Sequence, residues 1–282
     1  MTKYTKAALF SKAIAVLITL VLSTFTHADL MISPTRVFLD DGARTFEVNL
    51  INTGKQARSY RVEWKQMAAL QQGGYRALTE KEKSQYSSLE RFVRISPKQV
   101  SLAPGGRQTV KLLVRKPGGL QSGEYRSHLS FIALPSNQNS SSKNAGSSIS
   151  LNVLMSYTMP VIYRVGSVLV NPEITEISLV HKKETGITNI KVDLYHDDLF
   201  STHGRFIAYW TPVNEQTRQV GLLNGYNFYP EIKNATTQFP WQDFKLEPGR
   251  LEVRYEGQGE FTGLLLSQKT LTITQQMINS VK

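Results

Sequence analysis

Cysteine is absent from this chain of 282 residues. Its absence excludes disulfide bonds, cysteine nucleophiles and thiolate zinc sites, so a hydrophobic core must stabilise each domain. The chain also lacks long segments in which apolar residues recur with the period of a helix. The apolar run over residues 13–22 is shorter than the about 20 residues that a membrane-spanning helix needs. These absences point away from a helical fold and from a membrane span in the mature chain.

The short apolar run belongs to a secretory signal. Three lysines precede it: Lys3, Lys6 and Lys12. The small residues that a signal peptidase reads end at Ala28. We predict that residues 1–28 are a cleaved signal peptide and that the mature chain begins at Asp29; the alternative, an uncleaved membrane anchor, is disfavoured by the length of the run. The net charge of +11 favours acidic partners, but the basic residues are dispersed and the chain is exported, which excludes nucleic acid.

Motifs of common enzymes are missing as well. There is no Gly-x-Ser-x-Gly elbow, no His-Glu-x-x-His helix and no phosphate-binding loop. The segment Gly257-Gln-Gly259 lacks the third glycine of a dinucleotide fingerprint. The cluster of residues 196–198 with His203 has imidazole and carboxylate groups, but no spacing that fixes a metal geometry, so we interpret it as a solvated loop. We therefore predict a protein that is not an enzyme, with no catalytic residue, metal or cofactor.

What the sequence does contain is many short segments with strict alternation. Phe46, Val48 and Leu50 alternate with polar residues, which is typical of half-buried antiparallel strands. Glycine- and proline-rich turns separate such segments, and in the second half we expect turns at Asn224-Gly225 and Pro248-Gly249. Further candidate strands are Ile174–Val180, Ile190–Tyr195, Phe206–Trp210, Val220–Tyr229, Leu251–Tyr255 and Leu264–Ile273. The sequence predicts an all-β protein of two immunoglobulin-like sandwiches, with domains at 29–165 and 166–275 and a loose tail at 276–282.

One segment, residues 149–164, alternates for much longer than an ordinary strand. Apolar or aromatic residues occupy every odd position from Ile149 to Tyr163. At ~3.3 Å per residue the segment is about 50 Å long, so one end should project beyond its own sheet as an edge. A polar stretch, residues 135–148, leads into that end. A long apolar edge is an aggregation hazard unless it serves to bind another chain. An ordinary core strand is the alternative.

Several motifs in order resemble the periplasmic pilus chaperones of the chaperone–usher pathway. They are residues 33–42, 48–54, 60–64, 94–97, 102–112, 123–129 and 162–164. Together they cover most of the first domain, and the 123–129 run is similar to the divergent, archaic-like branch. The resemblance implies two immunoglobulin-like domains set in an L. It also implies a chaperone that binds pilus or fimbrial subunits (pilins) by donor-strand complementation in the periplasm and delivers them to an outer-membrane usher.

The resemblance also assigns site residues. Arg36 matches the arginine that holds the carboxylate at the end of the bound subunit, and Arg164 and Arg126 are weaker candidates for that role. Glu124 and Arg164 match a structural ion pair in the cleft. The donor-strand side chains are assigned to the first four odd positions: Ile149, Leu151, Val153 and Met155. Many members carry a lysine as second anchor where this chain has Pro160, and since proline donates no hydrogen bond we expect strand pairing to break or bulge there.

A secreted adhesin or carbohydrate-binding module with two β-sandwiches is the alternative function. Such proteins bind through loops or aromatic platforms, whereas the unusual feature of this sequence is an edge strand. Glycan binding on one side and rescue of an unstable subunit on the other would distinguish the two.

Overall fold

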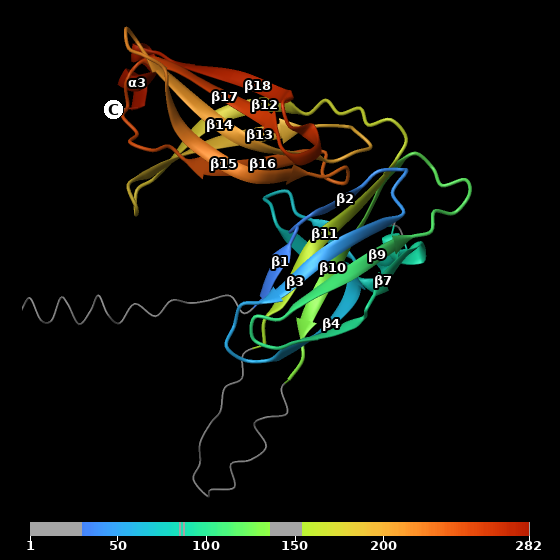
Figure 1. Cartoon of the computed structure of the whole chain (residues 1–282). Coiled ribbons are helices and arrows are strands. Elements are labelled where there is room, and N and C mark those ends of the chain that lie inside the picture. The colour runs from blue at the N-terminus through green and yellow to red at the C-terminus, as the bar shows by residue number, and fades with distance from the viewer. Residues whose placement is uncertain (1–29, 85, 87, 136–153, 282) are drawn as a thin grey trace, which may run out of the picture.

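The computed structural model describes residues 30–84, 86, 88–135 and 154–281, so the predicted signal peptide lies outside the described residues. The described chain folds into two β-sandwiches that together form an L (Figure 1). The predicted fold class is therefore confirmed. Within the described ranges, no helix has the length and apolar character needed to cross a membrane.

The first domain contains a four-stranded and a five-stranded sheet. The order of the first sheet is β1-β3-β9-β7, with β1 at Leu30–Ser33, β3 at Thr45–Asn52, β9 at Arg107–Val114 and β7 at Val93–Ser96. The order of the second sheet is β2-β11-β10-β4-β8, with β2 at Val37–Leu39, β11 at Ser156–Val165, β10 at Gly123–Ala133, β4 at Arg58–Lys65 and β8 at Gln99–Leu102. The hairpin of β5 (Met67–Ala69) and β6 (Tyr75–Ala77) leads into the short helix α2 (Glu80–Lys83) and the 3-10 turn η1 (Leu89–Arg91).

The alternation in the sequence places one face of each strand in the core between these sheets. Val48 and Leu50 of β3 are buried, and so are Tyr60 and Val62 of β4. Phe131 of β10 lies among them without exposed surface. Burial of each such side chain stabilises the domain by about 1.5–3 kcal/mol as an upper range. The core therefore replaces the missing disulfides, as the sequence predicts.

The first strand segment of the domain changes sheets. β1 pairs antiparallel with β3, whereas β2 pairs parallel with β11, where Val37 lies opposite Val161 and Leu39 opposite Tyr163. The short β2 therefore covers only one part of the β11 edge. From Ser156 to Pro160, β11 has β10 on one side, and no strand among the described residues pairs with its other side. We call this side of Ser156–Pro160 the open edge.

The expected break at Pro160 is not found. The register between β10 and β11 runs without a shift from Gly123 to Ile132, and His128 lies opposite Pro160. Alternate residues of a strand direct their backbone groups to opposite neighbours, so the nitrogen of Pro160 can point toward the open edge and leave the pairing with β10 intact. The backbone N–H that proline lacks is therefore missing on the open edge and not on the side of β10.

The second domain contains a three-stranded and a four-stranded sheet. The first has the order β12-β13-β16, with β12 at Glu173–Lys182, β13 at Ile187–Tyr195 and β16 at Asn234–Pro240. The second has the order β15-β14-β17-β18, with β15 at Arg218–Phe228, β14 at Thr202–Pro212, β17 at Gly249–Gly257 and β18 at Leu265–Ile273. The 3-10 turn η3 (Gly259–Phe261) joins β17 to β18. Trp210, Phe206 and Tyr255 lie fully buried between the sheets.

Three features of the second domain differ from the sequence prediction. The strand β16 was not predicted. The segment Asn224-Gly225 is not a turn between strands: it lies inside β15, where these two residues face Arg205 alone and Gly225 has a φ of 70°, as in a β-bulge. The end of the chain is not a loose tail but a helix, α3 (Gln275–Val281), which buries Ile278 against the core.

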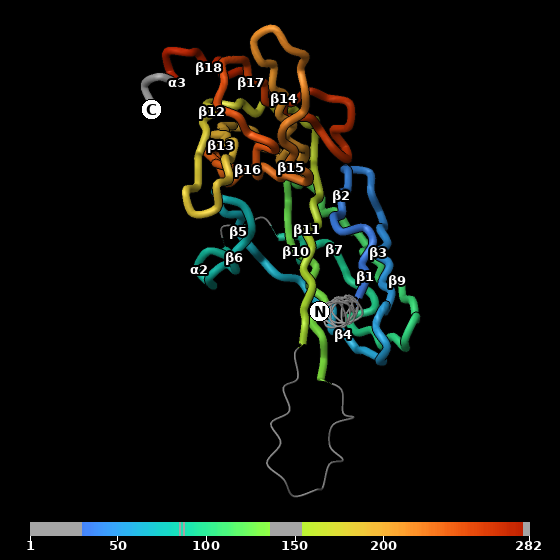
Figure 2. The backbone as a smooth tube through the Cα atoms, turned by 90° about the vertical axis from the view of Figure 1, so that its left-hand side faces the viewer, coloured from blue at the N-terminus to red at the C-terminus, as the bar shows by residue number. Residues whose placement is uncertain are grey.

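The hairpin β5–β6 crosses from the first domain to the second (Figure 2). The backbone N–H of Thr236 donates to the carbonyl of Gln71 at 3.2 Å, and the Tyr75 and Tyr229 hydroxyls lie 2.7 Å apart. The two domains are therefore joined by the hairpin as well as by the chain between β11 and β12.

Candidate functional site

Arg36 lies where the open edge ends. It directly precedes β2, whose first residue, Val37, is opposite Val161 of β11. Because β2 and β11 run parallel, Arg36 is level with Pro160, the last residue of the open edge. A strand added to the open edge would therefore meet the start of β2 at Arg36.

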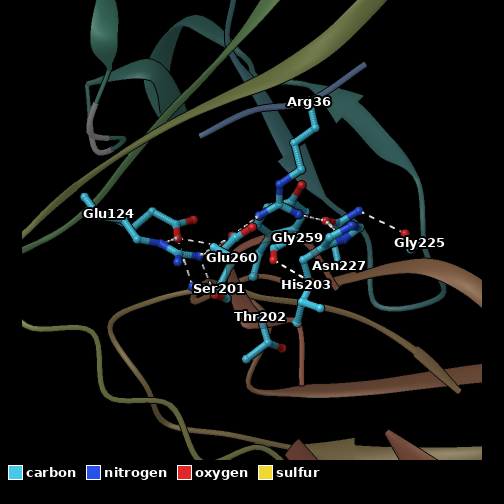
Figure 3. A network of polar contacts seen from close by, with 12 residues as sticks. Arg36, Glu124, Ser201, Thr202, His203, Gly225, Asn227, Gly259 and Glu260 are labelled. Atoms are coloured by element: carbon cyan, nitrogen blue, oxygen red, sulfur yellow. Dashed lines mark hydrogen bonds and ion pairs between the residues drawn. The ribbon is translucent and has the colours of Figure 1, made fainter. Parts of the chain in front are cut away.

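The guanidinium of Arg36 points into the cleft between the domains and contacts the second domain (Figure 3). Nη1 donates to Oδ1 of Asn227, and Nη2 donates to Oε1 of Glu260 at 3.2 Å. His203 lies 3.0 Å from the same Asn227 oxygen. Burial, followed by the charge of Arg36, lowers the pKa of His203. The Nε of Arg36 is buried and has no hydrogen-bond partner among the described residues, so it is a donor unused by that part of the chain.

A buried ion pair lies next to this contact. Glu124 of β10 and Arg164 of β11 face each other in register, with 3.0 Å between Arg164 Nε and Glu124 Oε2 and side chains that are 3% and 2% exposed. Ser201 of the second domain donates to the same carboxylate from its backbone at 2.9 Å and its hydroxyl at 2.7 Å. Its carbonyl accepts from Arg164 Nη2 at 2.6 Å. The pair thus connects both domains and has little capacity left for a ligand.

Arg126 is engaged in a second junction between the domains. Its guanidinium pairs with the Glu231 carboxylate and stacks over the Tyr229 ring at 3.8 Å from the ring centre. Burial acts to raise the pKa of Glu231, but Arg126 outweighs it and the pKa lies below its ordinary value. Glu231 also accepts from the backbone N–H of Ala69 in the hairpin at 3.2 Å. Arg126 therefore cannot take a second carboxylate without releasing Glu231.

A buried histidine lies under the hairpin. His128 of β10 is covered by the Tyr75 ring, with 4.6 Å between ring centres. Neither ring nitrogen has a hydrogen-bond partner in the part of the chain that the structure describes. Burial, with the charge of Arg126 as second cause, lowers the pKa of His128 to about 3. The imidazole is therefore neutral at physiological pH, and it supplies no positive charge beside Pro160, which lies opposite it.

The predicted donor residues lie partly outside the described residues. This applies to Ile149, Leu151 and Val153. Met155 is described: it lies just before β11, and its residue surface is 60% exposed. Four residues further on, at the same parity, Met159 is buried in the core with 4% exposed. The face that packs into the first domain, partly at Tyr157 and fully at Met159, is therefore solvent-exposed at Met155.

The polar cluster around His196 has structural partners. His196 is buried, and its Nε2 lies 3.0 Å from the Tyr229 carbonyl. His203 contacts Asn227 rather than this cluster. In the part of the chain that the structure describes, no group of three or more metal-ligating side chains comes together.

No protein-family model matches the sequence, and no curated protein matches it. Similar solved structures include the YadV chaperone, with 10% identity over 87% of this chain and 100% of that chain and a TM-score of 0.45. The CupB2 chaperone of Pseudomonas aeruginosa has 13% identity over 86% and 99%, with a TM-score of 0.44. A complex of the chaperone CsuC with the tip adhesion subunit CsuE, from the archaic chaperone–usher Csu pili of Acinetobacter baumannii, has 14% identity over 88% and 99%, with a TM-score of 0.41.

Proposed function

We propose that this protein is a periplasmic chaperone that binds pilus or fimbrial subunits by lending them the edge of β11 and delivers them to an outer-membrane usher. The observation that carries the proposal is the open edge of Ser156–Pro160, with Met155 exposed before it and Arg36 at its end. A subunit sandwich that lacks one strand has unpaired backbone groups and an unfilled groove. In donor-strand complementation between chaperone and pilin, a known form of strand addition, the added strand pairs with those backbone groups and its side chains fill the groove.

The open edge also sets the direction of the bound strand. If the carboxylate at the end of a subunit binds Arg36, the last strand of that subunit runs toward β2 and therefore parallel to β11. Its pairing has to end where β2 begins, and Pro160 offers no N–H at that point. The arginine that binds the carboxylate and the last paired residue of β11 thus lie at the same place, which favours one register of the bound strand. A shift by one residue would turn the donor side chains away from the groove.

Arg36 is suited to a carboxylate. Its guanidinium presents two donors in a plane and can bind both oxygens at once. Arg164 and Arg126 are less suited, because their side chains are only 2% and 7% exposed against their carboxylate partners. Arg36 is 14% exposed, and its carboxylate partner, Glu260, also contacts Arg164. We therefore retain Arg36 as the anchor and assign Arg164, with Glu124, to the junction between the domains.

A carbohydrate-binding module is less well supported. Sugar platforms need exposed aromatic rings, and among the large exposed apolar side chains of the described residues Tyr195 is the one aromatic. The export signal of residues 1–28 supports a periplasmic location for the mature chain.

Purification of the tagged full-length protein from the periplasm of its own cells tests the proposal. We expect a sandwich-like polypeptide that lacks one strand to co-purify with the wild type and to be lost from Met155→Ser. The Lys81→Ser variant, which changes an exposed side chain on α2, should retain it. Glycan binding without any such polypeptide would favour the carbohydrate-binding module instead.

A further inference from the structure

Two arginines share one carboxylate in the cleft. Oε1 of Glu260, on the short turn η3, lies 3.2 Å from Nη2 of Arg36 and 3.4 Å from Nη2 of Arg164 (Figure 3). Arg36 comes from the first domain and Glu260 from the second. The two side chains are 14% and 15% exposed, which places this contact at the rim of the buried network rather than inside it.

We propose that Glu260 is a resident competitor for Arg36, which a subunit's terminal carboxylate must displace. This inference rests on the proposed function and adds a residue that determines how the cleft selects its ligand. In the absence of a subunit, the Glu260 carboxylate occupies one donor of the Arg36 fork and the amide oxygen of Asn227 occupies another.

The charge of the network explains why displacement is required. Arg36 and Arg164 are balanced by Glu124 and Glu260, so the four side chains are formally neutral. An added carboxylate would give the half-buried network a net negative charge, and two carboxylates on one guanidinium repel each other. The incoming group therefore binds well only when Glu260 turns away from Arg36.

Glu260 can turn away without loss of the buried pair. Arg164 keeps its contacts to Glu124 at 3.0 Å and to the Ser201 carbonyl at 2.6 Å. Glu260 has exposed surface and lies on a turn of three residues, so water can solvate its released carboxylate. The exchange thus concerns the rim of the network alone.

The consequence is selectivity for a carboxylate at the end of a strand. A small free carboxylate has to displace Glu260 with no other contact to compensate. A carboxylate at the end of an extended chain also gains backbone hydrogen bonds along the open edge. Once the chain is paired there, its carboxylate binds Arg36 within the same complex. The competitor therefore discriminates against acidic metabolites and acidic side chains that reach Arg36 without pairing to β11.

The test uses the full-length protein and two labelled probe peptides. Both are decapeptides of alternating valine and threonine; one ends in a free carboxylate and the other in an amide. Fluorescence anisotropy gives their affinities for the wild type, for Glu260→Gln and for Glu256→Gln. The last variant is the matched control, because it removes one carboxylate from the same domain, where Glu256 pairs with Arg205 at 2.9 Å.

We expect Glu260→Gln to strengthen binding of the carboxylate peptide by about ten- to hundredfold, the size of one charge-assisted contact, and to leave the amide peptide unchanged. Glu256→Gln should change neither. In Arg36→Gln/Glu260→Gln the preference for the carboxylate should vanish. Equal effects of Glu260→Gln and Glu256→Gln, or weaker binding in Glu260→Gln, would overturn the competitor role. Failure of both peptides to bind any variant would instead refute strand addition itself.

Discussion

Two methionines of the same strand segment offer a sharp test of the donor-strand assignment. Met155 and Met159 have the same side chain and the same parity, but Met155 is exposed and Met159 is buried in the core of the first domain. Replacing each by serine should therefore separate the stability of the protein from the proposed binding of subunits.

The expected magnitudes follow from burial. Met159→Ser removes a buried thioether chain and leaves a cavity, which costs about 2–4 kcal/mol and lowers the melting temperature on the order of 10 °C. Met155→Ser changes an exposed side chain, so the free energy of unfolding should stay within about 0.5 kcal/mol of the wild type. If Met155 is a donor residue, it fills the groove of a bound subunit, and its loss should weaken binding roughly tenfold to a hundredfold.

Thermal melts of the purified variants and subunit levels in the periplasm measure the two effects separately. Ser156→Ala, on the exposed opposite face of β11, is the control and should be mild in both assays. A fall in melting temperature for Met155→Ser as large as that for Met159→Ser would show that Met155 packs into its own domain. Unchanged subunit levels in Met155→Ser would show that the donor segment lies elsewhere.

Three further outcomes are expected. Arg36→Ala should fold normally and weaken subunit binding by roughly ten- to hundredfold, because a charge-assisted bond is lost; unchanged co-purification of the subunit would show that Arg36 is not the anchor. Glu124→Gln should destabilise the protein in urea by about 3 kcal/mol, because it leaves Arg164 buried with a lost partner, whereas Glu63→Gln, at an exposed pair, should cost about 0–1 kcal/mol. The pKa of His128 is depressed to about 3 in the folded state, so below about pH 6.5 the unfolded chain binds a proton that the folded chain does not. The free energy of unfolding should therefore fall as pH drops from about 6.5 toward 3. His128→Phe should flatten that part of the stability curve, and an unaltered pH profile of this variant in urea titrations would contradict this account.

Strands were predictable where the apolar pattern is regular. Residues such as Phe46, Val48 and Leu50 alternate strictly, and they lie in β3 as expected. The segment of β16 reads Asn-Ala-Thr-Thr-Gln-Phe-Pro, in which only Ala235 and Phe239 are buried apolar residues. Two apolar residues four positions apart fit the spacing of a helix as well as that of a strand, so this strand was missed. The bulge at Asn224-Gly225 was read as a turn because the same residue pair serves both structures.

The site residues of the first domain were predictable from the sequence, and those of the second domain were not. Arg36, Glu124 and Arg164 lie in motifs of the first domain. Glu260 and Asn227 become part of the site only through the way the second domain is placed against the first, more than a hundred residues away in the chain. No local pattern marks a carboxylate as a partner of an arginine in another domain, so the competitor could be found only in the folded structure.

Pro160 has a different significance in the sequence and in the structure. In the sequence it stands where the resemblance to pilus chaperones implies a lysine, which suggests a weaker clamp. In the structure it stands at the last position of the open edge, beside the start of β2, and its ring removes one donor there without disturbing β10. A lysine at this position would add a second positive charge near Arg36, whereas proline instead limits how far an added strand can pair. Under the proposed function, the position of the ligand therefore depends on the geometry of the edge and on competition at Arg36, rather than on two cations.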